Sequence, residues 1–181
     1  SLLMEIGKAE HHIHLDTFII ASDPLGQIIA DALIDKARQG VEVRVIYDDV
    51  GSWKTKNRFF DRMRAEGIKV YAFMPVRFPI FTSKVNYRNH RKICVIDGEV
   101  GFIGGMNIAN RYVKGIKKLA WRDTHVKITG AAVYGLQRAF LVDWFFVSRE
   151  LITNHVYYPV SKVAENDSLI QIVTSSPTSL W

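Results

Sequence analysis

Apolar positions in the first half of the chain alternate between a strand-like and a helix-like period. Strands are expected over 12–20, 41–47 and 68–73, and helices over 24–40 and 56–66. Asp23 suits the N-cap of the first helix, Pro24 suits its first position, and Gly40 suits its end. This order of strand, helix, strand, helix and strand is typical of parallel strands covered by helices.

The pattern of apolar positions in the second half of the chain differs from that in the first half. Residues 74–89 carry prolines, aromatics and basic side chains, which indicates a loop leading to a site. Two short apolar runs flank Asp97-Gly98 and predict a hairpin, because this dipeptide favours tight turns. Strands are expected over 91–96, 100–103, 124–129 and 168–174, and a helix from Ala131 that buries a stripe of Val133, Leu136, Phe140 and Trp144. We therefore expect an α/β fold, with a mixed, largely parallel β-sheet flanked by helices on both faces.

The amino-acid composition excludes some classes of protein and of binding site. The chain has 181 residues and suits one domain over 1–181, with both ends expected to be truncated. Its single cysteine, Cys94, excludes an internal disulfide and a cysteine-based zinc site. No run of about 18 apolar residues is present. The net charge of +6 favours anionic partners, which include nucleic acid, phospholipid headgroups and phosphate substrates, without choosing among them.

A histidine and a lysine share one of the predicted strands. His90 and Lys92 are two residues apart, so alternation places both on one face, about 7 Å apart along the strand. A phosphate group fits between two such side chains. Asp97 is expected on the opposite face at the hairpin turn, where it fixes the turn rather than touching a substrate. The pair predicts a phosphate site.

These residue types suit phosphodiester chemistry without a metal. An imidazole can attack phosphorus and form a phosphohistidine, while Lys92 balances the charge of the oxygens. An acid must then protonate the leaving alkoxide. Gly105 would let the backbone approach a ligand, and Asn107 would donate a hydrogen bond to a phosphate oxygen. Asp123 is our candidate for the group that orients the His90 ring.

The residues His90, Lys92, Asp97, Gly105 and Asn107 match the H-x-K-x(4)-D…G-x-N signature of the phospholipase D superfamily. The flanking segments resemble its bacterial cardiolipin synthase branch: 43–52, 89–92, 121–123, 143–144 and 171–177. The resemblance implies a phospholipase D-like lobe. Members of this superfamily build one active site from two such motifs, in which one histidine is the nucleophile and the other the general acid.

This chain has one motif. His125-Val126-Lys127 begins like a second, but Ala132 stands where the aspartate belongs, so we interpret it as an ordinary strand. The chain is therefore expected to be the first catalytic half of a two-lobed enzyme. It should be inactive alone unless two copies pair. Whether His90 is the nucleophile or the acid stays open.

The resemblance implies a phosphatidyltransferase that joins two phosphatidylglycerol molecules into cardiolipin and releases glycerol. The implied partners are anionic phospholipid, a membrane surface, and a second half of the same protein or a second copy. The implied location is the bacterial cytoplasmic membrane, with anchors outside this chain. Neither a metal nor a nucleotide cofactor is implied, and no nucleic-acid partner is expected. Two alternatives are a homodimeric hydrolase or nuclease of the same superfamily, and a non-catalytic lobe that binds phosphate or lipid.

Three further features have two interpretations each. His11, His12 and His14 fit partly buried histidines better than a metal site, because no third ligand has suitable spacing. The segment 74–81 is either a lipid-facing lip or a loop packed on the core. Lys114, Lys117 and Lys118 either attract anionic headgroups or form a solvated loop.

Overall fold

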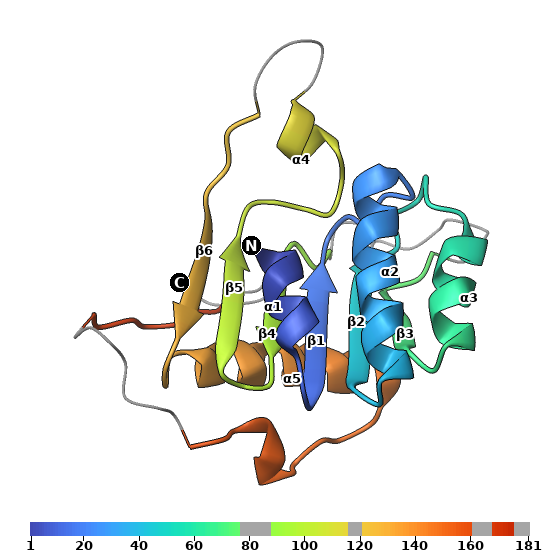
Figure 1. The fold of residues 1–181 in the computed structure, drawn as a ribbon. Coiled ribbons are helices and arrows are strands. Elements are labelled where there is room, and N and C mark those ends of the chain that lie inside the picture. The colour runs from blue at the N-terminus through green and yellow to red at the C-terminus, as the bar shows by residue number, and fades with distance from the viewer. Residues whose placement is uncertain (77–87, 116–120, 161–167, 176–181) are drawn as a thin grey trace.

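The computed structural model describes residues 1–76, 88–115, 121–160 and 168–175 (Figure 1). The helices are α1 Leu2–Lys8, α2 Pro24–Arg38, α3 Asn57–Ala65, α4 Arg111–Lys114 and α5 Val133–Ser148, with a 3₁₀ helix at His155–Tyr157. The strands are β1 His12–Thr17, β2 Glu42–Asp48, β3 Lys69–Phe73, β4 Lys92–Ile96, β5 Val100–Gly104 and β6 His125–Thr129.

The six strands form one sheet in the order β3-β2-β1-β4-β5-β6. β1, β2 and β3 are parallel, as predicted, and β4 then pairs antiparallel with both β1 and β5. The β5–β6 pair is also antiparallel. The prediction of a mixed sheet is confirmed, but its largely parallel character is wrong, since three of these five pairings are antiparallel. The three-residue turn between β4 and β5 is too short for the crossover that a parallel pair requires.

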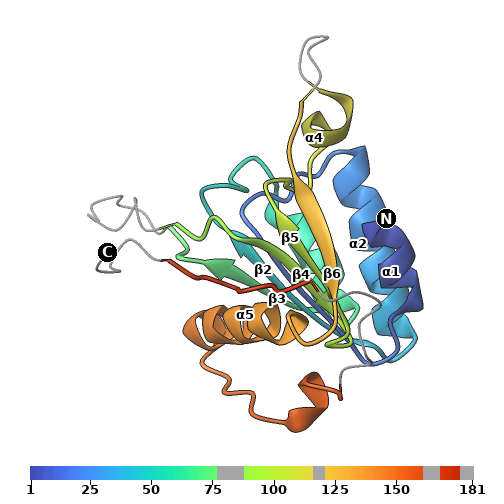
Figure 2. The ribbon, with the colours of Figure 1, turned by 90° about the vertical axis from the view of Figure 1, so that its left-hand side faces the viewer.

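Helices cover both faces, as predicted (Figure 2). α1, α2 and α3 lie on one face, and their apolar residues join β1 and β2 in the larger core cluster. α5 lies across the other face. Its predicted stripe of Val133, Leu136, Phe140 and Trp144 is fully buried, which stabilises the fold by roughly 1.5–3 kcal/mol for each aliphatic or phenyl side chain.

The predicted start of α2 is confirmed, whereas the helix ends at Arg38, two residues before the predicted Gly40. The Asp23 carboxylate accepts from the backbone N–H of Gly26 at 3.1 Å, as an N-cap does. Gly40 follows the helix with φ +90°, where a side chain would be strained.

The strand predicted at 168–174 is wrong, because residues 168–175 form no strand. Ile172 instead packs against α5 at Gly135, where an added Cβ would come within 2.6 Å of the isoleucine side chain. In Figure 2 this segment runs along α5. Ile172 therefore covers α5, whereas Leu169 and Val173 are exposed, and none of these residues pairs with a sheet edge.

Candidate active site

The predicted motif lies where β4 begins. Lys92 pairs with Thr17 at the end of β1, so it lies at the carboxyl end of the parallel strands. Ligands of open α/β sheets bind at this end. The intervening Arg91 forms an ion pair with Asp143 of α5. Side chains alternate along the chain here, so His90 and Lys92 face away from α5.

Both predicted phosphate-binding side chains meet at Phe18. The His90 ring lies 4.7 Å from the Phe18 ring, centroid to centroid, and the Lys92 ammonium lies 5.3 Å from the same centroid. The Lys92 ammonium also donates to the His90 carbonyl oxygen at 2.6 Å. His90 is exposed, whereas Lys92 is buried. The imidazole is thus open to a substrate, and the ammonium lies directly behind it.

The environment lowers the pKa of both groups, which favours their neutral forms. Burial lowers the pKa of Lys92 to about 8, against the opposing carboxylates of Asp123, Asp16 and Asp48. Burial also lowers the pKa of His90, and the Lys92 charge lowers it further, while Asp48 opposes the shift. At neutral pH the imidazole is therefore unprotonated and the ammonium largely charged. This combination suits attack on a phosphorus whose oxygens need a cation.

A cluster of buried carboxylates holds Asn89, the residue before His90, in place. The sequence analysis did not predict this cluster. The Asn89 amide donates to Asp16 at 2.9 Å and to Asp143 at 3.3 Å, while the Asn89 backbone N–H donates to Asp48 at 3.2 Å. Burial and then the Asp143 charge raise the pKa of Asp16 well above its ordinary value. The signal for this cluster in the sequence was the presence of an acidic residue inside an otherwise apolar strand or helix.

Asp97 lies at the other end of β4, about 17 Å from Lys92 by the rise of a strand. Its carboxylate accepts from the backbone N–H groups of Glu10, His11 and His12 at 2.8–2.9 Å. Its own φ of +54° belongs to the turn. Asp97 therefore ties the hairpin to the start of β1, in keeping with a supporting role away from the substrate.

Gly105 and Asn107 were predicted to line the site, and their contacts are with Asp123, Ile19 and Tyr112. A Cβ at Gly105 would come within 1.9 Å of an Asp123 carboxylate oxygen, so the glycine permits this approach. The Asn107 side chain is buried; it accepts from the Ile19 N–H at 2.9 Å and donates to the Tyr112 hydroxyl at 2.6 Å. Asn107 thus ties the segment after β1 to α4, and its expected contact with phosphate stays a prediction.

Asp123 and His125 lie beside Lys92. Burial lowers the pKa of Lys92 and of His125, and the nearby Asp123 carboxylate opposes both shifts. No hydrogen bond joins Asp123 to His90 in the described residues, so its orienting role stays a prediction. The prediction of a strand at His125 is confirmed. The His125 Nδ1 is buried without a hydrogen-bond partner among the described residues, and burial, then the Lys92 charge, lowers the pKa of this imidazole. The sequence analysis did not predict it as a neighbour of the site.

Two of the three early histidines, His12 and His14, belong to the core under α5. His12 and His14 are fully buried rather than partly buried. The Gln137 amide donates to His14 Nδ1 at 2.8 Å, and the His14 ring stacks on Phe140 at 4.4 Å between centroids. Over 1–76, 88–115, 121–160 and 168–175, no three His, Cys, Asp or Glu side chains are grouped to hold a metal. His12 and His14 are therefore core residues, buried more deeply than predicted, whereas His11 is exposed.

The remaining expectations concern lipid contact. Residues 77–81 of the proposed lip lie outside the described residues, as do Lys117 and Lys118. Among the helices that the structure describes, none combines the length and the apolar character needed to cross a bilayer.

Comparison with known proteins gives one consistent family. A family model described as "Cardiolipin synthase, PLD-like domain" matches residues 2–144. The cardiolipin synthase of Geobacillus kaustophilus is 45% identical over 183 residues, covering 100% of this chain and 36% of the relative. The cardiolipin synthase of Alkalihalophilus pseudofirmus is 44% identical, covering 99% and 36%. The chain thus spans about a third of the length of these curated relatives.

Solved structures show the same fold at low identity. The phosphatidylserine synthase of Haemophilus influenzae aligns with a TM-score of 0.61 and 20% identity, covering 79% of this chain and 33% of that one. Nuc of Salmonella typhimurium, a phospholipase D family member, aligns with a TM-score of 0.58 and 17% identity, covering 81% and 86%.

Proposed function

Because the chain belongs to the PLD-like domain family of cardiolipin synthases, we propose that it is one catalytic lobe of a phosphatidyltransferase that makes cardiolipin from phosphatidylglycerol. The observation that supports this most is the meeting of His90 and Lys92 at Phe18. An unprotonated imidazole and a buried ammonium on one side of a site suit a phosphodiester better than a neutral substrate.

In the proposed reaction His90 is the nucleophile. Its unprotonated ring nitrogen attacks the phosphorus of one phosphatidylglycerol, and the bond from phosphorus to the terminal glycerol oxygen breaks. Glycerol leaves with a proton from a general acid, and a phosphatidyl-histidine remains. The hydroxyl of a second phosphatidylglycerol then attacks phosphorus and gives its proton to the same group, now a base. The P–N bond breaks and cardiolipin is released.

The lowered pKa of His90 is the reason for giving it this role, since a general acid must carry a proton at working pH. Lys92 stabilises the negative oxygens as the phosphorus gains its fifth substituent. Asp123 and Asn107 complete the proposed site as the group that orients His90 and a phosphate donor. The general acid would come from a second lobe of the same protein or from a second copy. The complete enzyme would act at the bacterial cytoplasmic membrane.

The test uses the full-length protein with phosphatidylglycerol and mass spectrometry of the products. Equal amounts of cardiolipin and glycerol are expected, and His90→Ala should remove both. His155→Ala is the matched control, because His155 is exposed and lies in the 3₁₀ helix after α5. Phosphatidic acid as the main product would indicate a hydrolase, and cleavage of DNA with no lipid product would indicate a nuclease. Unchanged turnover in His90→Ala would remove His90 from the mechanism.

A further inference from the structure

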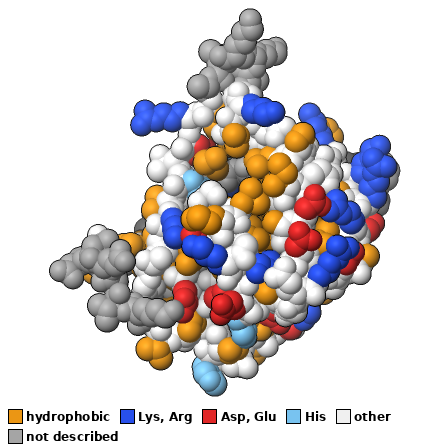
Figure 3. Space-filling view, viewed as in Figure 1, with side chains coloured by type: hydrophobic (Ala, Val, Ile, Leu, Met, Phe, Trp, Pro, Cys, Tyr) orange, Lys and Arg blue, Asp and Glu red, His pale blue; other side chains and the backbone are white. Residues whose placement is uncertain are grey.

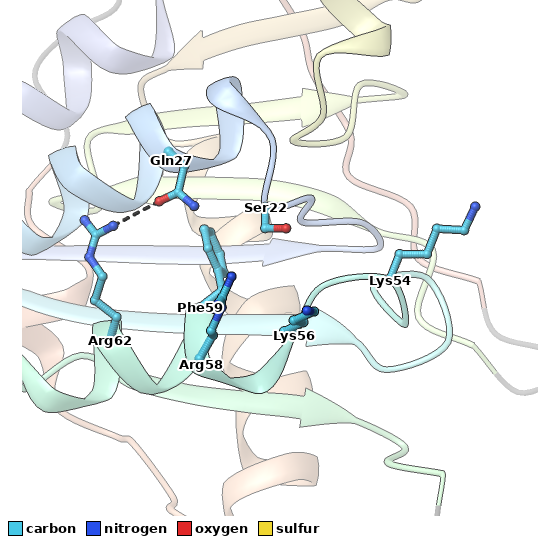
Figure 4. Close-up of a pocket in the computed structure, with 7 residues that line it drawn as sticks. All are labelled: Ser22, Gln27, Lys54, Lys56, Arg58, Phe59 and Arg62. Atoms are coloured by element: carbon cyan, nitrogen blue, oxygen red, sulfur yellow. Dashed lines mark hydrogen bonds between the residues drawn. The ribbon is translucent and has the colours of Figure 1, made fainter.

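A basic pocket lies beside the site, in the groove between α2 and α3 (Figure 4). Its volume is about 320 Å³. The lining comprises Ser22, Gln27, Lys54, Lys56, Arg58, Phe59 and Arg62. Four of these seven side chains are cationic and none is acidic, so the pocket has the charge and the polar groups of an anion site.

Within the part of the chain that the structure describes, three of the four cations lack a carboxylate partner. Arg62 forms an ion pair with Asp31 and donates to Gln27 at 2.9 Å, which holds its guanidinium at one wall. Lys54, Lys56 and Arg58 form no ion pair with any other described residue. All three are exposed, and Lys54 extends away from Lys56 and Arg58 (Figure 4). A phosphate bound beside Lys56 and Arg58 would be held by charge-assisted hydrogen bonds. Basic side chains stand along the edge of the molecule that α2 and α3 form, with acidic side chains among them (Figure 3).

The pocket shares a wall with the candidate active site. Residues 18–22 lead from Phe18, which contacts His90 and Lys92, to Ser22 in the pocket lining. Two side chains of the loop that carries Lys54 fix this segment. The Ile20 N–H donates to the Ser52 hydroxyl at 3.0 Å, and the Thr55 hydroxyl donates to the Ile20 carbonyl at 2.6 Å.

An exposed tryptophan stands next to the pocket. Trp53 precedes Lys54 and is 77% exposed, which is unusual for the largest apolar side chain. Tryptophan and basic residues together are typical of surfaces that lie in the headgroup layer of a bilayer. A soluble phosphate ion would make no use of such a side chain, so the neighbourhood favours a lipid as the source of the anion.

We propose that this pocket binds the phosphate of an anionic phospholipid headgroup, so that the rim carrying Trp53 docks on the membrane beside the active site. The pocket is separate from His90 and Lys92 and would hold a lipid that is not the one reacting. The choice of a phospholipid rests on the proposed function. The bound chemistry is a phosphate ester, and inorganic phosphate is the probe that separates a free ion from a lipid.

The experiment holds the full-length protein in phosphatidylcholine nanodiscs, which cover any membrane anchor, and measures by co-sedimentation its binding to vesicles of phosphatidylcholine with and without phosphatidylglycerol. The double variant Lys56→Gln/Arg58→Gln should bind the anionic vesicles about 30-fold more weakly, since each cation near an anionic leaflet contributes about fivefold. Trp53→Ala should also weaken binding. The control Lys8→Gln/Arg38→Gln removes the same charge from two exposed ion pairs and should bind like the wild type.

Several results would overturn the proposal. Equal weakening in both double variants would mean that net charge alone governs binding. Unchanged vesicle binding in the pocket variant would exclude a lipid headgroup site. This holds even if the wild type binds inorganic phosphate tightly. Turnover of a soluble short-chain phosphatidylglycerol separates this from the proposed function: the pocket variant should keep it and His90→Ala should lose it. If the pocket variant fails to behave as expected, the proposed reaction still stands. Turnover by His90→Ala would refute the proposed reaction and would leave the pocket proposal untouched.

Discussion

Replacing Lys92 with arginine should change how activity depends on pH. Burial is the main cause that lowers the pKa of Lys92 to about 8. Above that pH the ammonium loses its proton, so the charge that stabilises the phosphate oxygens disappears. At pH 9 about one tenth of the molecules would keep the charge, and kcat/KM should fall about tenfold for each further pH unit. Arginine stays charged throughout this range, although its planar group fits the site less well.

The measurement is kcat/KM of the full-length protein from pH 5 to 10 on a soluble short-chain phosphatidylglycerol, because kcat/KM reports groups of the free enzyme. Wild type should lose activity above pH 8, whereas Lys92→Arg should be less active at pH 7 but keep its activity to pH 9.5. Lys69→Arg, an exposed lysine paired with Glu150, is the control and should follow the wild type. An alkaline limb at the same pH in Lys92→Arg would refute the assignment of that limb to Lys92.

Three further predictions concern the scaffold. The fold should lose stability in acid, because burial lowers the pKa of His12 to about 4 and lowers the pKa of His14 as well. Below about pH 6.5 the unfolded chain binds protons on these histidines that the folded chain does not bind. The stability is therefore full above that pH and falls below it. Urea unfolding should show a loss of about 2 kcal/mol from His12 between pH 6.5 and pH 5, and equal stability at both pH values would contradict this. Asp97→Ala should cost about 2–4 kcal/mol in the same assay, since three backbone N–H groups lose their acceptor; a near-neutral effect would exclude the tie between hairpin and β1. Gly105→Ala should lower kcat at least tenfold because its Cβ would collide with the Asp123 carboxylate, whereas Gly7→Ala, with open space around it, should leave kcat unchanged.

Local signals in the sequence predicted most of the elements. The cap at Asp23, the glycine after α2 and the apolar stripe of α5 each depend on neighbouring residues alone. The hairpin around Asp97-Gly98 is a signal of the same kind. The shared face of His90 and Lys92 followed from alternation, and Phe18 is the residue on which both converge.

The remaining features depend on contacts between distant segments. Asn89 joins Asp16 to Asp143, which are more than 120 residues apart, and no local pattern pairs them. The order of the strands is likewise set by packing between elements. The apolar run at 168–174 fits a strand and a helix-covering segment equally well, and only the presence of α5 decides between them. The proximity of His125 to Lys92 required the β5–β6 pairing.

The most direct test of the central claim is to trap the covalent intermediate. Full-length protein is mixed with phosphatidylglycerol carrying radiolabelled phosphorus, quenched in alkaline denaturant within the first turnover, and digested for peptide mapping. Phosphorus is predicted on the peptide that contains His90, in an acid-labile and base-stable bond, and absent from that peptide in His90→Asn. Label carried by a different histidine, with His90→Asn still labelled, would contradict the claim that this imidazole attacks phosphorus.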